Sequence, residues 1–213
     1  MPVRWLDRTI PAPDAGPALG PAPGGADHPM RTVTQQIAFE AGWSAPRRAK
    51  VAALFDDLAE GWDARYAADP TRSAPLADAL SRGGRLQGPC LEVGSGTGQN
   101  TGALERHLGP VISVDLSGEM LRRAGGRRVQ ADAVALPVPD RSAGTIVLVN
   151  AFLFPAETDR VLAADGSLVW VNTSGSDTPI HLTPEAVEEA LPGHWHGVAA
   201  DAGRGLWAVF RRA

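Results

Sequence analysis

The sequence predicts an α/β fold, in which a doubly wound, mostly parallel sheet of seven strands ends in a C-terminal antiparallel hairpin. Three observations support this prediction. Short apolar runs alternate with amphipathic segments from residue 89 onward, a glycine-rich stretch directly follows the first run, and glycines divide the last twenty residues into two apolar runs. Because strands that alternate with helices form parallel sheets, helices are expected on both faces.

Five runs are expected to form the parallel strands, at residues 89–93, 111–115, 127–132, 145–151 and 167–172. The run at 145–151, TIVLVNA, is mostly apolar, which predicts a strand buried on both faces. The final stretch, 194–213, is divided at Gly203 and Gly205 into two runs, and this division predicts the hairpin.

Capping residues and glycines mark the helices between these runs. Helices are expected at 99–108, 117–124 and 181–191, with Gly109 as a stop signal and Ser117 and Thr183 as N-caps. A short helix should precede a turn at Asp165-Gly166, which leads into the fifth strand.

The N-terminal part of the chain has a different character. Residues 1–30 are rich in proline and glycine, which disfavour helices and sheet ladders. This segment is expected to be a loose tail, with a lid anchored by Trp5, Leu6 and Ile10 as the alternative. We therefore divide the chain into residues 1–44, a candidate lid, and residues 45–213, the main domain.

Two helices are expected at the start of the main domain. The helix that begins near Pro46 carries one apolar face, formed by residues at helical spacing: Val51, Leu54, Phe55 and Leu58. A second short helix should cover residues 73–82 and end at Gly83-Gly84.

Composition limits the classes of function. The net charge of −4 and the pI near 5.7 argue against a nucleic-acid partner. Cys90 is the single cysteine, so no internal disulfide is expected. No apolar stretch has the length of a membrane span, and no signal-peptide core is evident. We expect a cytoplasmic protein without a membrane partner.

The most informative feature is the stretch from Glu92 to Gly98, EVGSGTG, which follows an apolar strand and precedes a helix. Glycines at this position let the backbone approach a ligand where a Cβ would collide. Asp115 stands 17 positions after Gly98, at the end of the next apolar run. A carboxylate there is placed to accept hydrogen bonds from a ribose, so the pattern predicts a site for a nucleoside-bearing cofactor.

The glycine spacing bears on which cofactor binds. A dinucleotide fingerprint requires G-x-G-x-x-G, and here Gln99 stands at the sixth position. The pattern Glu-x-Gly-x-Gly-x-Gly instead resembles motif I of the class I S-adenosylmethionine-dependent methyltransferases, a family with a Rossmann-like sheet. The resemblance spans roughly residues 50–213 and implies S-adenosyl-L-methionine as cofactor and methyl transfer to a small-molecule acceptor as activity.

The resemblance also assigns site residues. Glu92 would lie near the cofactor's ammonium, and the backbone of Gly94, Ser95 and Gly96 would line its methionine part. Asp115 would bind the ribose hydroxyls. The remaining assignments concern the adenine and the reacting centre: Leu116 and Ala133 beside the adenine, Asp132 at its amine, and Asn150 near the sulfonium.

No catalytic dyad is visible in the sequence, and no metal site is expected. His181, His194 and His196 are the candidate bases, and Asp63 and Tyr66 are candidates to cap the cofactor or orient the acceptor. Two other functions remain open, a nicotinamide-dependent oxidoreductase and a non-catalytic S-adenosylmethionine-binding protein. The identity of the acceptor and the oligomeric state are left open.

Overall fold

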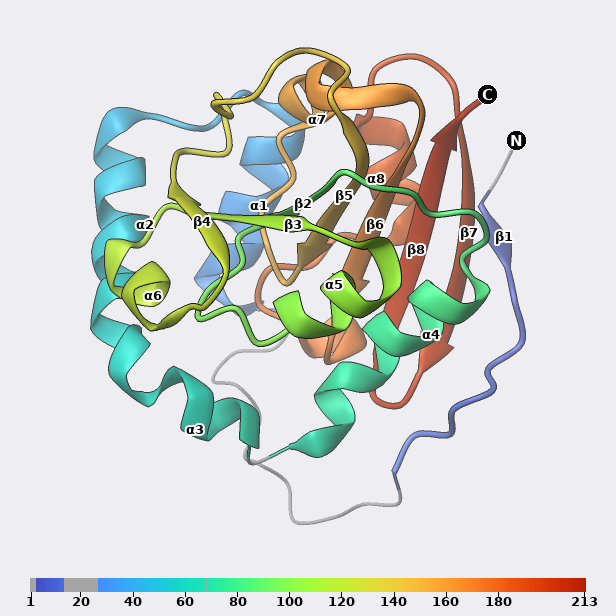
Figure 1. Ribbon diagram of the computed structural model, residues 1–213, viewed down its shortest axis with the longest axis horizontal. Coiled ribbons are helices and arrows are strands. Elements are labelled where there is room, and N and C mark those ends of the chain that lie inside the picture. Colours follow the sequence, from blue (N-terminus) through green and yellow to red (C-terminus); the bar gives the residue numbers. More distant parts are fainter. Residues whose placement is uncertain (1–2, 14–26, 68) are drawn as a thin grey trace.

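The computed structural model describes residues 3–13, 27–67 and 69–213, except the side chains of Tyr66 and Pro70. Its centre is an eight-stranded sheet in the order β1-β7-β8-β6-β5-β2-β3-β4 (Figure 1). The strands have these bounds: β1 Arg4–Trp5, β2 Cys90–Val93, β3 Val111–Asp115, β4 Arg127–Gln130, β5 Ala143–Val149, β6 Leu162–Asn172, β7 Trp195–Ala202 and β8 Gly205–Arg212.

The sheet is parallel except around β8, which pairs antiparallel with both β6 and β7. This is the C-terminal hairpin that the sequence predicts. The order of the parallel strands reverses at the β2–β5 pair, where the chain runs outward through β3 and β4 on one side and through β6 on the other. Such a reversal leaves a crevice beyond the carboxyl ends of the strands, which is where open α/β sheets bind ligands.

The helices have these bounds: α1 Pro29–Phe39, α2 Ala45–Leu58, α3 Trp62–Ala67, α4 Ala74–Arg82, α5 Thr101–Leu108, α6 Gly118–Arg123, α7 Pro155–Val161 and α8 Pro184–Ala190. The expected caps form, because the Ser117 hydroxyl accepts from the Met120 N–H and the Thr183 hydroxyl accepts from the Ala186 N–H. Among the described helices, none combines the length and the apolar character that a membrane span needs.

Two apolar cores cover the two faces of the sheet. On one face, Leu80 of α4 and Leu104 of α5 pack in a cluster with Val147 of β5. On the other face, Val187 of α8 packs in a cluster with Ile146 of β5. Since successive residues of β5 enter opposite clusters, this strand is buried on both faces, as its apolar composition predicts.

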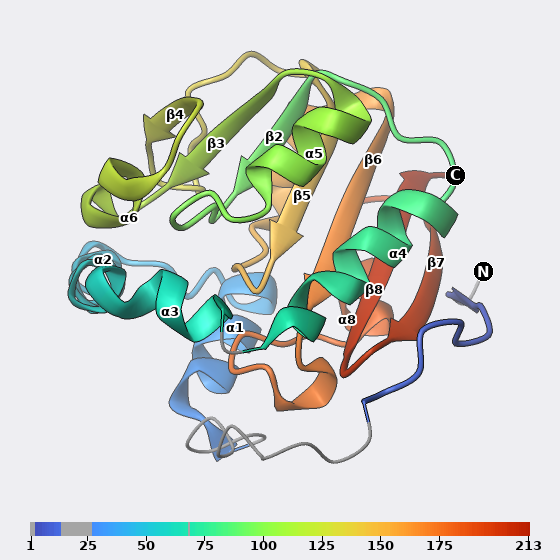
Figure 2. The same ribbon diagram turned by 60° about the horizontal axis from the view of Figure 1, so that its bottom comes forward.

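Helices α1, α2 and α3 belong to neither face and lie across the carboxyl ends of the strands (Figure 2). Helix α2 packs against α6, and α1 packs against α8. The three helices thus span the crevice at the reversal point.

The sheet has one strand more than the seven expected. Arg4 and Trp5 pair in parallel with Val198 and Ala199 of β7, and the Leu6 N–H donates to the Ala199 carbonyl. A two-residue strand is too short to show any alternation of apolar and polar residues, which is why the sequence pattern does not reveal it.

Residues 3–13 follow this edge of the sheet and are not a loose tail. The Gly203 N–H donates to the carbonyl of Ile10, and Leu6 and Ile10 pack against the core that contains α4. Trp5 is exposed and donates from its indole to Glu185. None of these residues lines the cavity described below. Of the proline-rich stretch 1–30, residues 1–2 and 14–26 lie outside the described residues, and Pro29 and Met30 begin α1.

A second difference concerns Asp165-Gly166, where the sequence predicts a turn. The strand β6 begins at Leu162 and passes through these two residues, and the register against β5 shifts between Ala143 and Thr145. Gly166 therefore lies at an irregularity within a strand and not in a turn. A Cβ at this position would lie 2.8 Å from Leu162 Cγ.

Asp78 of α4 joins the N-terminal segment to the sheet. Its carboxylate is buried and accepts from the indole N–H of Trp207, 2.7 Å away, and from Arg82 and Thr9. We expect Asp78→Ala to lower the free energy of unfolding by about 3 kcal/mol, because the buried indole N–H loses its partner. Urea unfolding measures this change.

Asp201→Ala is the matched control. Asp201 pairs with Arg8 at 3.1 Å in a half-exposed position, so its loss should cost less than about 1 kcal/mol. Equal effects of the two substitutions would contradict the role given to Asp78.

Candidate cofactor-binding site

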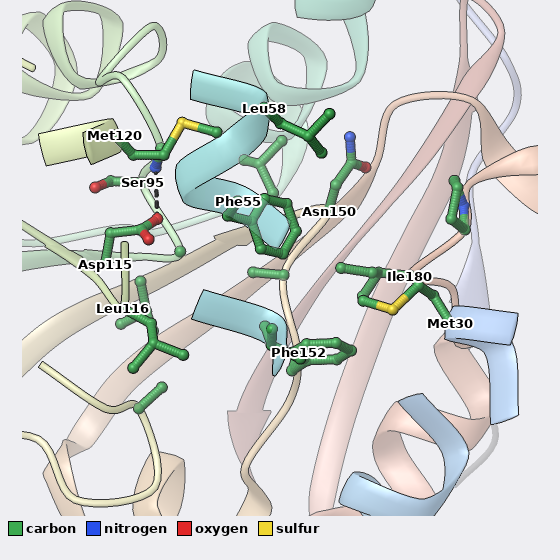
Figure 3. Close-up of a pocket in the computed structure, with 18 of the residues that line it drawn as sticks. Met30, Phe55, Leu58, Ser95, Asp115, Leu116, Met120, Asn150, Phe152 and Ile180 are labelled. Atoms are coloured by element: carbon green, nitrogen blue, oxygen red, sulfur yellow. Dashed lines mark hydrogen bonds between the residues drawn. The ribbon is translucent and has the colours of Figure 1, made fainter. Parts of the chain in front are cut away.

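A cavity of about 520 Å³ lies at the reversal point of the sheet. Its floor is formed by the carboxyl ends of β2, β3 and β5 and the loops that follow them, and its cover by residues of α1, α2 and α3. Eight of the nine site residues predicted from the sequence line it: Gly94, Ser95, Gly96, Asp115, Leu116, Asp132, Ala133 and Asn150. Figure 3 shows how several of these side chains converge.

The loop after β2 needs its glycines. Gly94, Gly96 and Gly98 have φ angles of 70°, 57° and 79°, a region that side chains disfavour. A Cβ on Gly94 would also lie 2.6 Å from the Cβ of Ala151. Two hydrogen bonds from the Gly94 and Ser95 N–H groups to the Val114 carbonyl tie the loop to the end of β3.

Asp115 holds the loop from the other strand. One carboxylate oxygen accepts from the Gly96 N–H and the other from the Ser117 N–H, both at 2.8 Å. Burial raises the pKa of Asp115 above its ordinary value, although these backbone N–H groups oppose the shift. Since a carboxylate has about four acceptor positions, Asp115 can still accept from a ligand in the cavity.

Glu92 is the one predicted site residue that does not line the cavity. It is only 2% exposed, and its Oε2 accepts from the hydroxyls of Thr101 and Ser113. Its Oε1 has no protein partner. Burial raises the pKa of Glu92 to about 7, against the opposing hydrogen bonds from the two hydroxyls.

The expected adenine wall is present, with an unexpected contact at its polar end. Leu116 and Ala133 both line the cavity. The carboxylate of Asp132 accepts from the indole N–H of Trp43 through both oxygens, at 3.0 and 2.9 Å. Trp43 lies between α1 and α2, so the group expected to bind the adenine amine already contacts the cover.

Asn150 has a φ of 51°, in the left-handed region that asparagine tolerates better than most residues. Its side-chain N–H donates to the hydroxyl of Thr173, and its side-chain oxygen accepts from the Thr173 N–H. The amide therefore joins the ends of β5 and β6. Asn150 lines the cavity, but most of its hydrogen-bonding capacity is committed to this junction.

Two further carboxylates attach the cover to the sheet. Asp56 of α2 accepts from the Ser117 hydroxyl and from the Glu119 N–H at the start of α6. Asp63 of α3 accepts from the Thr97 hydroxyl in the glycine-rich loop and from the Gln99 side chain. From the sequence, Asp63 is a candidate to cap the cofactor or orient the acceptor. The structure places its carboxylate on the loop instead, and the Tyr66 side chain lies outside the described part.

The candidate base His181 lies away from the cavity wall. Its ring Nδ1 is 2.8 Å from the side-chain oxygen of Asn172, and burial lowers its pKa to about 4. The imidazole is therefore neutral near pH 7 and joins two segments of the chain. His194 and His196 belong to the start of β7 and its preceding loop, and they also do not line the cavity.

Several cavity residues gave no signal in the sequence. Met30 and His28 come from the start of α1, Trp43 from the α1–α2 connection and Ile180 from the loop after β6. The apolar face of α2 is the exception, because its helical spacing is visible in the sequence. All four residues of that face line the cavity.

The groups that line the site fit S-adenosyl-L-methionine. Ser95 is 7% exposed, lines the cavity and has a hydroxyl without a protein partner, so this hydroxyl can bond to a polar ligand group. Asp115 offers acceptor positions for ribose hydroxyls, and Leu116 and Ala133 offer an apolar wall for a base. These donors and acceptors fit a nucleoside that carries an amino acid. Among the described residues of the glycine-rich loop, no Lys or Arg is present to bind a pyrophosphate.

The fold and the site have the features that the sequence resemblance to class I S-adenosylmethionine-dependent methyltransferases implies: a mostly parallel sheet, a glycine-rich loop after β2 and a carboxylate at the end of β3. Residues 91–169 match the family model described as a methyltransferase domain, which confirms the resemblance predicted from the glycine-rich stretch. The match covers the part of the chain that holds the glycine-rich loop and the strands β3 to β5.

Solved structures support the same fold. DhpI in complex with SAH is 21% identical, with 76% of this chain and 95% of that chain covered and a TM-score of 0.60. A SAM-dependent methyltransferase from Thermotoga maritima is 14% identical, with 76% and 99% covered and a TM-score of 0.57. At these identities the likeness establishes the fold. No curated protein matches the sequence.

The buried Glu92 predicts a pH-dependent stability. Because its pKa of about 7 lies above the ordinary value of 4.5, the folded state binds this proton more tightly, and ionisation destabilises the fold as pH rises through this range. Glu92→Gln removes the ionisation. We expect its free energy of unfolding to gain about 2 kcal/mol relative to the unmodified protein between pH 5 and pH 8.

Urea unfolding at several pH values measures this difference. The control is Glu189→Gln, at an exposed position of α8, where no such gain is expected. A pH-independent difference between Glu92→Gln and the unmodified protein would contradict the prediction.

Proposed function

We propose that the chain transfers a methyl group from S-adenosyl-L-methionine to a small-molecule acceptor. The proposal rests on one observation. The glycine-rich loop, the Asp115 carboxylate and a set of apolar side chains all line the same cavity. When bound, the cofactor supplies an electrophilic methyl group on a sulfonium, whose displacement leaves a neutral thioether.

Each predicted site residue has a role in this proposal. Ser95, with its unpartnered hydroxyl, and the backbone of Gly94 and Gly96 would hold the methionine part. Asp115 would accept from the ribose hydroxyls. For the adenine, Leu116 and Ala133 would form the walls and Asp132 would accept from the amine. Glu92 would act from behind the loop, toward the cofactor's ammonium.

The chain's own residues would promote the reaction by positioning and by excluding water. The leaving thioether requires no proton, so a base matters only for a protonated acceptor. Asn150 holds the ends of β5 and β6 together at the cavity floor. The apolar face of α2 covers the same space and keeps water from the reacting groups.

The size of the cavity supports a small acceptor. Sites for a single drug-sized ligand have volumes of roughly 300–1,000 Å³. The cavity of about 520 Å³ would have to hold both the cofactor and the acceptor, so little of it is left for the acceptor. The net charge of −4 also disfavours a nucleic-acid acceptor.

The cover is proposed to act as a lid. Within the candidate lid of residues 1–44, the described residues His28, Met30 and Trp43 line the cavity. The main domain adds α2 and α3 to the same cover. Since the cover lies over the cofactor site, its movement would help the cofactor to enter and leave.

Calorimetric titration of S-adenosyl-L-methionine into the purified chain tests the proposed function. We expect micromolar binding, and a loss of at least tenfold in affinity in Asp115→Asn, because the amide nitrogen cannot accept from a ribose hydroxyl. The matched control is Asp140→Asn, whose carboxylate is exposed and pairs with Arg160 away from the cavity.

The outcomes separate the alternatives. Binding of NADH without binding of S-adenosyl-L-methionine would favour an oxidoreductase and overturn the proposal. Cofactor binding without methyl transfer to any acceptor would favour a non-catalytic binding protein. Binding of neither cofactor would contradict the proposed site.

The hydrogen bond between Trp43 and Asp132 predicts slow exchange of the cofactor. Trp43→Phe keeps an aromatic ring beside Phe152 and Phe154 but removes the indole N–H. A hydrogen bond to a charged group contributes about 1.5–3 kcal/mol. Its loss should therefore accelerate both association and dissociation of S-adenosylhomocysteine by about tenfold or more, as measured by stopped-flow fluorescence.

Trp5→Phe is the matched control, because its indole also donates to a carboxylate but lies away from the cavity. It should leave both rate constants unchanged. Unchanged rate constants in Trp43→Phe would contradict the proposed lid.

A further inference from the structure

We propose that the acceptor has an apolar, flat ring system, which binds in a lobe of the cavity on the side away from Asp115. This inference rests on the proposed function and specifies its substrate class. The acceptor lobe, as we call it, is formed by six lining residues: Met30, Val51, Phe55, Phe152, Phe154 and Ile180. In Figure 3, Met30 and Ile180 lie beyond Phe55 and Asn150 as seen from Asp115.

The acceptor lobe has apolar walls on two opposite sides. Met30 of α1 and Val51 and Phe55 of α2 come from the cover. The other three residues come from the loops that follow β5 and β6. Val51, Phe152, Phe154 and Ile180 belong to one buried apolar cluster, and Met30 and Phe55 pack against it, as do Leu116 and Ala133 of the expected adenine wall. A cluster that lines a cavity leaves apolar surface for a ligand to cover.

The aromatic rings of the acceptor lobe are held by other rings. Trp43 contacts Phe154 edge to face, with 5.4 Å between centroids, and contacts Phe152 at 6.0 Å. Phe55 packs edge to face against Trp62 at 5.9 Å. These contacts restrain the rings before any acceptor enters. Restrained aromatic walls favour a rigid, flat ligand, because little conformational entropy is lost on binding.

The polar groups near the acceptor lobe are largely committed to the protein. The Asn150 amide bonds to Thr173, and the Thr178 hydroxyl accepts from the Ser174 N–H. A charged group buried there would lose its hydration without gaining an ionic partner from the six lobe residues. The lobe should therefore discriminate against an acceptor with a charge on its ring system.

Ionisable side chains also line the cavity. Asp115 and Asp132 belong to the cofactor end. Asp177 and Arg65 are exposed, and His28 and Arg72 are half-buried. A polar substituent that projects toward solvent is thus compatible with the site, whereas the part of the acceptor inside the lobe has to be uncharged.

A matched pair of probes tests this inference by binding, without reliance on turnover. The protein is first saturated with S-adenosylhomocysteine and then titrated calorimetrically with 2-naphthol or with 6-hydroxy-2-naphthoate, which differ only by a carboxylate. We expect 2-naphthol to bind at least tenfold more tightly. The naphthoate binding as tightly or more tightly, or no measurable binding of 2-naphthol at millimolar concentration, would overturn the inference.

Two lobe variants locate the binding. Ile180→Glu and Met30→Glu place a carboxylate in the acceptor lobe from two different elements, and each should weaken 2-naphthol binding at least tenfold. The volume-conserving Ile180→Leu should change it less than threefold. Affinity for S-adenosylhomocysteine should stay within about threefold in all three variants, which also verifies that each variant folds.

The two proposals can fail separately. If S-adenosylhomocysteine binds and neither glutamate variant weakens 2-naphthol binding, the acceptor lobe is wrong and the methyltransferase proposal stands. If S-adenosylhomocysteine does not bind the unmodified protein, the proposed function fails and the inference about its acceptor falls with it.

Discussion

The Asp115 carboxylate is the interaction on which the organisation of this site depends. It stands at the end of β3 and accepts from the N–H groups of Gly96 and Ser117, so one side chain orients both the glycine-rich loop and the start of α6. Ser117 in turn caps α6 and donates to Asp56 of α2. A continuous chain of hydrogen bonds thus links the cofactor loop to the helix that covers it.

Hydrogen-bond donors around Glu92 and Asp115 explain why both carboxylates can be buried although burial is unfavourable for each. Glu92 and Asp115 both have raised pKa values because they are buried, and each is held by several donors. The donors are backbone N–H groups and hydroxyls at the point where the loop leaves the sheet. These buried groups need hydrogen-bond acceptors, and the two carboxylates supply them. The loop is therefore shaped in advance for its ligand, which reduces the entropy lost on binding.

The cavity under the cover has a polar end and an apolar end. At one end, the carboxylates of Asp115 and Asp132 and the glycine-rich loop present polar groups to a nucleoside. At the other end, aromatic and aliphatic side chains of the acceptor lobe present hardly any. Because both ends lie under the same helices, movement of the cover would open both together. Such coupling would admit cofactor and acceptor to one water-poor space, which is the setting that methyl transfer requires.

The sequence by itself determined the parts of the protein that local rules govern. The strands β2 to β5, the capped helices, the positive-φ glycines after β2 and the position of Asp115 all follow from short-range patterns. The tertiary structure alone decided the contacts between distant segments: Trp43 with Asp132, Asp63 with Thr97, and Asn150 with Thr173. It also showed that residues 4–5 form an eighth strand and that His181 is a buried structural residue. These features depend on single side chains, or on a two-residue strand, whose partners come close only when the chain folds. No periodicity in the sequence therefore predicts them.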